Sequence, residues 1–403
     1  MNNKKPLDGV RIIEMSTYVA APVAAKMLAD WGAEVIKIEP KFGDEYRIIG
    51  RSLAMPTFDD QNPCFDLENA NKKAISIDIR TQEGQEILHK LLKTADGLIT
   101  NYRNQALEKL HLTYEEIHQK HPSLVYGIVA GYGEKGPDKD KPGYDLTAFL
   151  ARSGMMIDTV EKGGNPMSIY ASFGDHITGT SLAAGMCAGL YKRSKTNIGD
   201  KVISGLYQNS LYCFSTMLAA TSYGLKYPIS HNNSPTPIVN SYQCKDGEWL
   251  LLAATNFERQ WTQVCKGVLK RPDLAENENY SSIKGMLKNK KEIIDIFDAE
   301  FATKDRQEWE VLLIENDIAH EKILHWEDVL NDRQAWENDY LMEVEHKNGT
   351  KSVLANTPVS FSSIEKPTFT QAPKIGEHTN EILQSLGYQS EHINQLRANN
   401  KIH

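Results

Sequence analysis

Short apolar runs of strand length alternate with stretches of helical periodicity through the first third of the chain. A strand, a helix and a second strand in succession form a βαβ unit, which predicts a parallel sheet with right-handed crossovers. The predicted strands are 10–15, 34–39, 74–79, 96–100 and 124–129, and the predicted helices among them are 22–30 and 82–92.

The composition changes after residue 220. A segment rich in Pro, Ser and Asn at 227–237 predicts a linker, and 238–253 predicts a hairpin that turns at 245–247. The amphipathic helices that follow predict a smaller α/β domain. The further predicted elements are a strand over 200–203, helices over 144–151, 208–220, 256–269, 291–301, 307–316 and 327–340, and a hairpin over 341–354.

Residues 172–180 read Ser-Phe-Gly-Asp-His-Ile-Thr-Gly-Thr and lead into a run of small residues that ends at Tyr191. Asp175 stands just before this run, which predicts it as the N-cap of a buried helix. A capping carboxylate accepts backbone N–H bonds and faces the positive end of the helix dipole, so we expect Asp175 to be ionised and nucleophilic. Because capping aspartates are common, a purely structural role is the alternative.

The turn between the first predicted strand and its helix, residues 16–21, contains no glycine. The dinucleotide fingerprint G-x-G-x-x-G is therefore absent where it would carry meaning, and so is a Walker A loop. A glycine-rich loop does follow the fifth predicted strand, over residues 130–137. A loop of this kind at the carboxyl ends of parallel strands lies beside a ligand in many α/β proteins, and a plain surface turn is the alternative.

Composition narrows the class of protein. At 403 residues the chain has room for two or three domains, and its net charge of −8 without a basic stripe argues against a general nucleic-acid binder. We find neither an apolar stretch of ~20 residues nor the apolar core of a signal peptide, so we expect a cytoplasmic protein without a membrane partner. The five cysteines lie far apart, which argues against structural disulfides and a metal site.

Several short motifs occur together, at 6–14, 28–39, 43–47, 71–73, 131–133, 143–145 and 174–179. In combination they resemble the class III CoA-transferase family, which includes formyl-CoA:oxalate and carnitine CoA-transferases. Within that family, the segments 66–75, 131–140 and 333–340 are similar to the (R)-2-hydroxyacid CoA-transferases of amino-acid-fermenting anaerobes. Those enzymes act on (R)-phenyllactate or (R)-2-hydroxyisocaproate.

The resemblance implies an α/β fold with two domains. A large Rossmann-like CoA-binding domain with a parallel sheet would be built from 1–222 and 326–403, and a smaller inserted α/β domain with its linkers from 223–325. Two such chains would interlock as rings in a homodimer. The family's glycine-rich loop over the active site is missing, because the corresponding residues 233–242 are stiffer and bulkier. A larger apolar acyl pocket is a hypothesis that follows from this difference.

The resemblance also assigns roles to individual residues. Asp175 falls on the family's catalytic aspartate. Formyl-CoA enzymes carry an arginine just after the second strand, where this chain has Pro40 and Lys41. The residues that fall on positions lining the CoA site, or that offer cations to its phosphates, are Tyr18, Val19, Ala20, Lys41, Ile77, Arg80, Asn101, Tyr102, Lys109 and Tyr144.

The implied reaction moves CoA from an acyl-CoA, such as an enoyl- or 2-hydroxyacyl-CoA, to the carboxylate of an (R)-2-hydroxyacid through aspartyl anhydride and aspartyl-CoA intermediates. Amino-acid fermentation, including leucine degradation, is the implied context. An α-methylacyl-CoA racemase is the nearest alternative, but it needs a histidine where this chain has Tyr144. A non-catalytic CoA-binding protein is the other alternative. The part played by His176 stays open.

Overall fold

The computed structural model describes residues 4–52, 55, 57, 62–168, 172–346, 348–364, 366 and 368–403. The described residues form two compact units. The large unit comprises 1–153, 169–219 and 333–403, and the small unit comprises 154–168 and 220–332. None of the described helices is long and apolar enough to cross a membrane.

A six-stranded sheet forms the centre of the large unit, with strand order β3-β2-β1-β4-β5-β6 and parallel pairing throughout. The predicted parallel sheet is confirmed. The order changes direction between β1 and β4, so the loops after these two strands leave the sheet toward opposite sides. The strands are β1 (Arg11–Met15), β2 (Glu34–Glu39), β3 (Lys73–Ser76), β4 (Gly97–Thr100), β5 (Val125–Ala130) and β6 (Lys201–Gly205).

Helices cover both faces of this sheet. Because successive strand residues point to opposite faces, neighbouring apolar residues pack against different helices. Ile12 packs into a cluster with α1 and α8, whereas Ile13 packs into a second cluster with α4. The helices α1 and α8 approach closely, since a Cβ on Gly179 would lie 2.5 Å from the carbonyl oxygen of Ala20. The covering helices are α1 (Ala20–Asp30), α3 (Pro63–Asn69), α4 (Gln82–Lys93), α5 (Asn104–Lys109), α6 (Tyr114–Lys120) and α8 (Phe173–Thr196).

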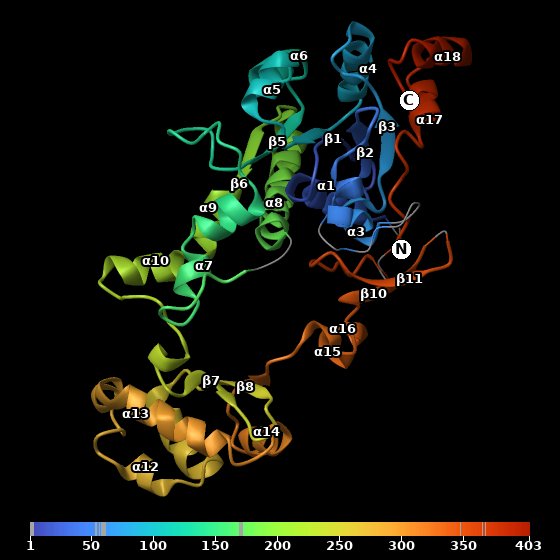
Figure 1. Ribbon diagram of the computed structural model, residues 1–403. Helices are drawn as coiled ribbons and strands as arrows, with labels where there is room; N and C mark the ends of the chain where they lie inside the picture. Colours follow the sequence, from blue (N-terminus) through green and yellow to red (C-terminus); the bar gives the residue numbers. More distant parts are fainter. Residues whose placement is uncertain are drawn as a thin grey trace. The chain divides into compact units, whose positions relative to one another are not determined.

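The last part of the chain returns to the sheet of the large unit. Figure 1 shows α17, at the red end of the colour bar, beside the blue strand β3, and α18 packs on α17. The backbone N–H of Ser76 in β3 donates to Thr379 Oγ1 at 3.2 Å, and Ile77 forms an antiparallel bridge with Ile402. The returning elements are α16 (Arg333–Glu337), β10 (Leu341–Glu345), β11 (Lys351–Ala355), α17 (Thr379–Ser385) and α18 (Ser390–Ala398).

Three predicted long helices differ from a single continuous α-helix. The prediction over 327–340 is wrong in its middle and at its end. Asn331 and Asp332 form a turn between α15 (Trp326–Val329) and α16, both residue types favour turns, and α16 ends at Glu337. The predicted helix 208–220 is split at Phe214 into α9 and α10. The prediction over 256–269 becomes α11 (Phe257–Thr262) followed by a π-helical stretch, η4 (Gln263–Val268).

The small unit packs helices on a three-stranded antiparallel sheet of order β7-β8-β9. The predicted hairpin at 238–253 is confirmed as β7 and β8. Aromatic rings fill the core, with Tyr242 stacked on Phe301 at 4.7 Å between centroids. The elements of this unit are α7 (Met155–Asp158), η3 (His231–Asn233), β7 (Val239–Gln243), β8 (Trp249–Ala253), α12 (Pro272–Glu276), α13 (Ile283–Phe301), α14 (Arg306–Glu315), β9 (His320–Lys322) and α15 (Trp326–Val329).

Short helices complete the chain. They are α2 (Tyr46–Ile49), η1 (Gly50–Ser52), the π-helix η2 (Asp145–Ala151), α9 (Leu206–Cys213) and α10 (Ser215–Ser222). The predicted helix at 144–151 therefore begins one residue later, at Asp145. The predicted strand at 200–203 corresponds to β6.

Candidate active site

The loops that leave β1 and β4 are tied together at the carboxyl edge of the large unit's sheet. The backbone N–H of Thr17 donates to Asn101 Oδ1 at 3.1 Å, and Asn101 Nδ2 donates to the Thr17 carbonyl oxygen at 2.7 Å. These loops flank the point where the strand order reverses, which is where open α/β sheets bind ligands. The side chain of Asn101 thus fixes the shape of the predicted CoA loop by bonding to the backbone of Thr17.

A buried network of charges supports the same loop. Tyr18 adopts a left-handed backbone with φ of 63°, and its N–H donates to Asp44 Oδ1 at 3.1 Å. The other oxygen of Asp44 lies 2.9 Å from Lys37 Nζ, which lies 2.8 Å from Glu14 Oε1. The side chains of Lys37, Glu14 and Asp44 are fully buried. The Tyr18 hydroxyl donates to Glu45 at 2.5 Å, so both ends of this tyrosine are held.

Tyr144 stands opposite Tyr18 and remains accessible. Their rings meet edge to face at 5.9 Å between centroids, and 49% of Tyr144 is exposed. Two glycines allow the glycine-rich loop to approach this region, because a Cβ on Gly131 would lie 2.8 Å from Gly143 Cα. The two tyrosines therefore offer an aromatic surface at the carboxyl edge.

The first turn of α8 carries Asp175 to the same edge. Ser204, near the carboxyl end of β6, donates through its hydroxyl to the Thr178 carbonyl oxygen of α8 at 3.1 Å. The prediction that Asp175 is the N-cap is wrong, because α8 begins at Phe173 with Ser172 as its N-cap. The capping carboxylate comes from η2 instead, where Asp145 Oδ1 accepts the N–H of Gly174 at 2.7 Å.

The electrostatic expectation for Asp175 is wrong as well. Burial, together with the nearby carboxylates of Asp145 and Glu68, raises the pKa of the Asp175 carboxyl to about 7, while His176 opposes this shift. Burial also raises the pKa of Asp145, although N–H groups of α8 oppose this shift. The helix-dipole effect invoked from the sequence is thus outweighed by burial and like charges. Asp175 is divided between its acid and its carboxylate near neutral pH.

His176 and Glu68 form an ion pair beside Asp175. His176 Nε2 lies 3.1 Å from Glu68 Oε1, and Nδ1 lies 2.7 Å from the Ser172 carbonyl oxygen. Burial alone would lower the pKa of His176, but the Glu68 carboxylate outweighs it and the pKa rises to about 9. Ser172 itself has a left-handed backbone with φ of 68°, and its hydroxyl interacts with Tyr46. Left-handed non-glycine residues concentrate at functional sites.

The other predicted CoA residues differ in accessibility. Val19 and Ala20 are buried at the start of α1, with 2% and 4% exposure, so their side chains face the core. Ile77 is buried, and Tyr102 packs against the core cluster around α4. The predicted cations are accessible: Lys41 and Lys109 are exposed, and 79% of the Arg80 side chain is exposed while its guanidinium pairs with Asp78 at 2.8 Å.

Sequence reasoning missed the two acids that surround Asp175. Asp145 had a signal, because it ends the Gly143–Tyr144–Asp145 motif already noted, although its capping role depends on tertiary packing. Glu68 had none, since only the folded chain brings α3 to the start of α8. Within the described residues, no group of three or more His, Cys, Asp or Glu side chains is arranged to hold a metal ion.

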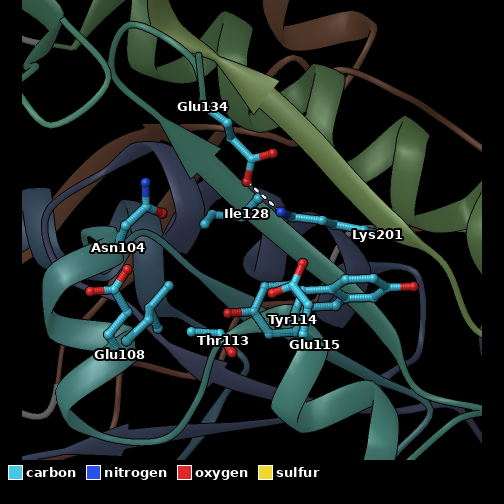
Figure 2. A pocket seen from close by; sticks show the side chains of 10 residues that line it. Asn104, Glu108, Thr113, Tyr114, Glu115, Ile128, Glu134 and Lys201 are labelled. Carbon is cyan, nitrogen blue, oxygen red and sulfur yellow. Dashed lines mark ion pairs between the residues drawn. The ribbon is translucent and has the colours of Figure 1, made fainter. Parts of the chain in front are cut away.

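A separate pocket of about 240 Å³ lies beside α5 and α6. Figure 2 shows Lys201 extending toward Glu134 across it, and their charged atoms are 2.5 Å apart. The predicted CoA-contact residues do not line this pocket. Its lining consists of Asn104, Leu107, Glu108, Thr113, Tyr114, Glu115, Tyr126, Ile128, Glu134 and Lys201.

Replacing Gly174 is expected to damage the site by overpacking. A Cβ there would lie 2.1 Å from Phe149 Cγ and 2.6 Å from Asp145 Oδ1. Phe149 is fully buried and cannot swing aside, so Gly174→Ala should lower the free energy of unfolding by about 2–3 kcal/mol in urea denaturation. Gly205→Ala is the matched control, because its nearest neighbouring atom would be 3.3 Å away. Equal stability of the two variants would contradict the overpacking account.

Comparison with known proteins gives a consistent result. The model of CoA-transferase family III matches residues 7–379. The (R)-2-hydroxy-4-methylpentanoate CoA-transferase of Clostridioides difficile is 44% identical over 97% of this chain and 98% of its own length. The cinnamoyl-CoA:phenyllactate CoA-transferase of Clostridium sporogenes is 40% identical over 100% of this chain and 98% of its own length. The crystal structure of Rv3272 from Mycobacterium tuberculosis matches with a TM-score of 0.81 at 26% identity, covering 94% of this chain and 99% of that one.

Proposed function

This chain belongs to CoA-transferase family III, and we propose that it moves coenzyme A from an acyl-CoA to the carboxylate of an (R)-2-hydroxyacid. The observation that carries the proposal is the carboxylate of Asp175 in the first turn of α8, which Asp145 caps, while the preceding residue Tyr144 meets Tyr18. Two relatives that match nearly the full chain are named for (R)-2-hydroxy-4-methylpentanoate and for phenyllactate, which supports the substrate class.

Asp175 would serve as the nucleophile. Its carboxylate attacks the thioester carbonyl, so a C–O bond forms, the C–S bond breaks and the electron pair leaves with the thiolate. The thiolate then attacks the Asp175 carbonyl of this anhydride and releases the first acid as a carboxylate. The hydroxyacid carboxylate attacks the resulting aspartyl thioester and expels the thiolate again. The thiolate finally attacks the hydroxyacyl carbonyl, which restores the Asp175 carboxylate without net proton transfer.

The residues of the large unit fit the substrate's parts. Lys41, Lys109 and Arg80 are accessible cations and would bind phosphates. Tyr18 and Tyr144 would contact the pantetheine and acyl portions. We also propose that two chains interlock as a dimer, that the inserted domain spans 223–325, and that the enzyme serves amino-acid fermentation.

A substrate panel tests the proposed function. Purified protein is mixed with cinnamoyl-CoA or an enoyl-CoA and with (R)-2-hydroxyisocaproate, (R)-phenyllactate, formate or oxalate, and each new thioester is followed by chromatography. We expect transfer to the (R)-2-hydroxyacids and little to formate or oxalate. Transfer confined to formate or oxalate would overturn the substrate class. Deuterium uptake at the α-carbon in heavy water, without transfer, would favour a racemase.

The rate of transfer is expected to fall on the acid side of neutrality. Because the pKa of Asp175 is raised to about 7, its nucleophilic carboxylate is lost as the pH falls through that value. The ratio kcat/KM reports groups of the free enzyme, so it should decline about tenfold per pH unit below this point. A profile that stays flat down to pH 5 would contradict the raised pKa.

A further inference from the structure

Both ring nitrogens of His176 face oxygen acceptors. Nδ1 lies 2.7 Å from the Ser172 carbonyl oxygen, which can only accept a hydrogen bond. Nε2 lies 3.1 Å from Glu68 Oε1, and Glu68 is 1% exposed. Nδ1 must therefore carry a proton, and a second proton is needed between Nε2 and the Glu68 carboxylate. A neutral imidazole has one N–H and cannot supply both.

The pair joins two elements that are distant in the sequence. Glu68 belongs to α3, whereas His176 belongs to the first turn of α8, directly after Asp175. The Ser172 carbonyl oxygen also accepts the backbone N–H of His176 at 3.0 Å, so the imidazole adds a second bond to the same N-cap residue. The ring thereby fixes the left-handed Ser172 that precedes the nucleophile's turn.

We propose that His176 and Glu68 act as a positioning pair, which shares one proton, anchors the first turn of α8 to α3 and places a positive charge next to Asp175. This proposal rests on the proposed function, because the pair is assigned to the same nucleophile, Asp175. With the proton on His176 the pair is neutral as a whole, and its positive member directly follows Asp175 in the sequence. The charge of His176 thereby opposes part of the rise in the Asp175 pKa that the carboxylates of Asp145 and Glu68 cause.

Removing either partner changes this balance differently. Without His176, Glu68 stays as an uncompensated carboxylate close to Asp175. Without Glu68, the pKa of His176 returns toward its ordinary value. The negative charge of Glu68 and the positive charge of His176 are then lost together, and the net charge beside Asp175 stays near zero. The other groups that face this cluster from neighbouring elements are Tyr46 of α2, Cys64 of α3, Lys72 ahead of β3, and Asp145 of η2.

The test compares pH profiles of kcat/KM for CoA transfer in wild type, His176→Gln, Glu68→Gln and the double variant. We expect the acid limb of His176→Gln to move about one pH unit higher, with transfer at pH 6 reduced about tenfold. The double variant should return the limb close to the wild-type position. The control His320→Gln removes a histidine of the small unit whose Nδ1 also faces a carbonyl oxygen, and its limb should not move.

If His176 had only a structural role, the His176→Gln variant would transfer CoA more slowly, but the acid limb of its pH profile would stay at the wild-type position. An unmoved limb, or a double variant that keeps the shift, would overturn the proposal.

Ring ¹⁵N NMR of wild type gives a second measurement that needs neither a variant nor substrate. We expect His176 to be doubly protonated at pH 8, and a neutral ring at pH 7 would overturn the proposal. Absence of transferase activity would instead refute the proposed function and leave this result intact.

Discussion

Asp175→Asn should reduce CoA transfer by at least about a thousandfold, the largest effect expected of any single substitution in this chain. The amide keeps the size of the side chain but lacks the charge and the nucleophilic oxygen needed to form the anhydride. Because the substitution removes a partly buried acid that lies among the carboxylates of Asp145 and Glu68, the free energy of unfolding should not decrease. Activity and stability are thus expected to separate in this variant.

Three measurements check this expectation. The first is the rate of thioester formation with an (R)-2-hydroxyacid, the second is urea denaturation, and the third is mass spectrometry of protein incubated with acyl-CoA. Wild type should gain a covalent adduct on the peptide containing Asp175, and the variant should not. Asp317→Asn is the matched control, because the Asp317 side chain is 92% exposed in the small unit. Transfer at the wild-type rate in Asp175→Asn would refute the mechanism.

Lys37→Met is expected to cost about 3–5 kcal/mol of folding free energy. The Lys37 ammonium is fully buried between the Glu14 and Asp44 carboxylates, so methionine would leave both acids without this cation. Burial alone would lower the pKa of Lys37, but these carboxylates raise it above its usual range. Because Asp44 also accepts the Tyr18 N–H, we expect weaker acyl-CoA binding in any variant protein that still folds.

Urea denaturation and the KM for acyl-CoA provide the measurements. Lys291→Met is the control, since Lys291 pairs with Asp295 on an exposed helix surface where ion pairs contribute about 0.5 kcal/mol or less. A Lys37→Met protein as stable as this control would show that the buried network contributes little.

The main architecture of the large unit could be predicted from the sequence. Its strands are apolar runs and its helices have clear periodicity, so local pattern and tertiary structure agree at β1, β2 and α4. The motif resemblance to class III CoA-transferases is confirmed by the family match. The breaks within helices were harder to predict. Around Phe214 and around the turn at 331–332, apolar and polar positions follow the pattern that a continuous helix would also show.

The electrostatics of the site could not be predicted in the same way. The segment around Asp175 satisfies every local requirement of an N-cap, yet Asp145 takes that role from another helix. The pKa of Asp175 depends on Glu68, which lies more than a hundred residues earlier in the sequence. Effects of this kind come from burial and from charges that only the folded chain assembles.

The contact between Asn101 and Thr17 restricts which substitutions evolution can accept there. Asparagine donates and accepts through one planar group, whereas aspartate lacks the donor and leucine lacks both functions. A lineage that changes residue 101 must acquire another way to shape the loop after β1 before the substitution becomes tolerable. Homologues with a different residue at this position are therefore expected to differ in the neighbouring residues 16–18 as well, and the two segments should vary together.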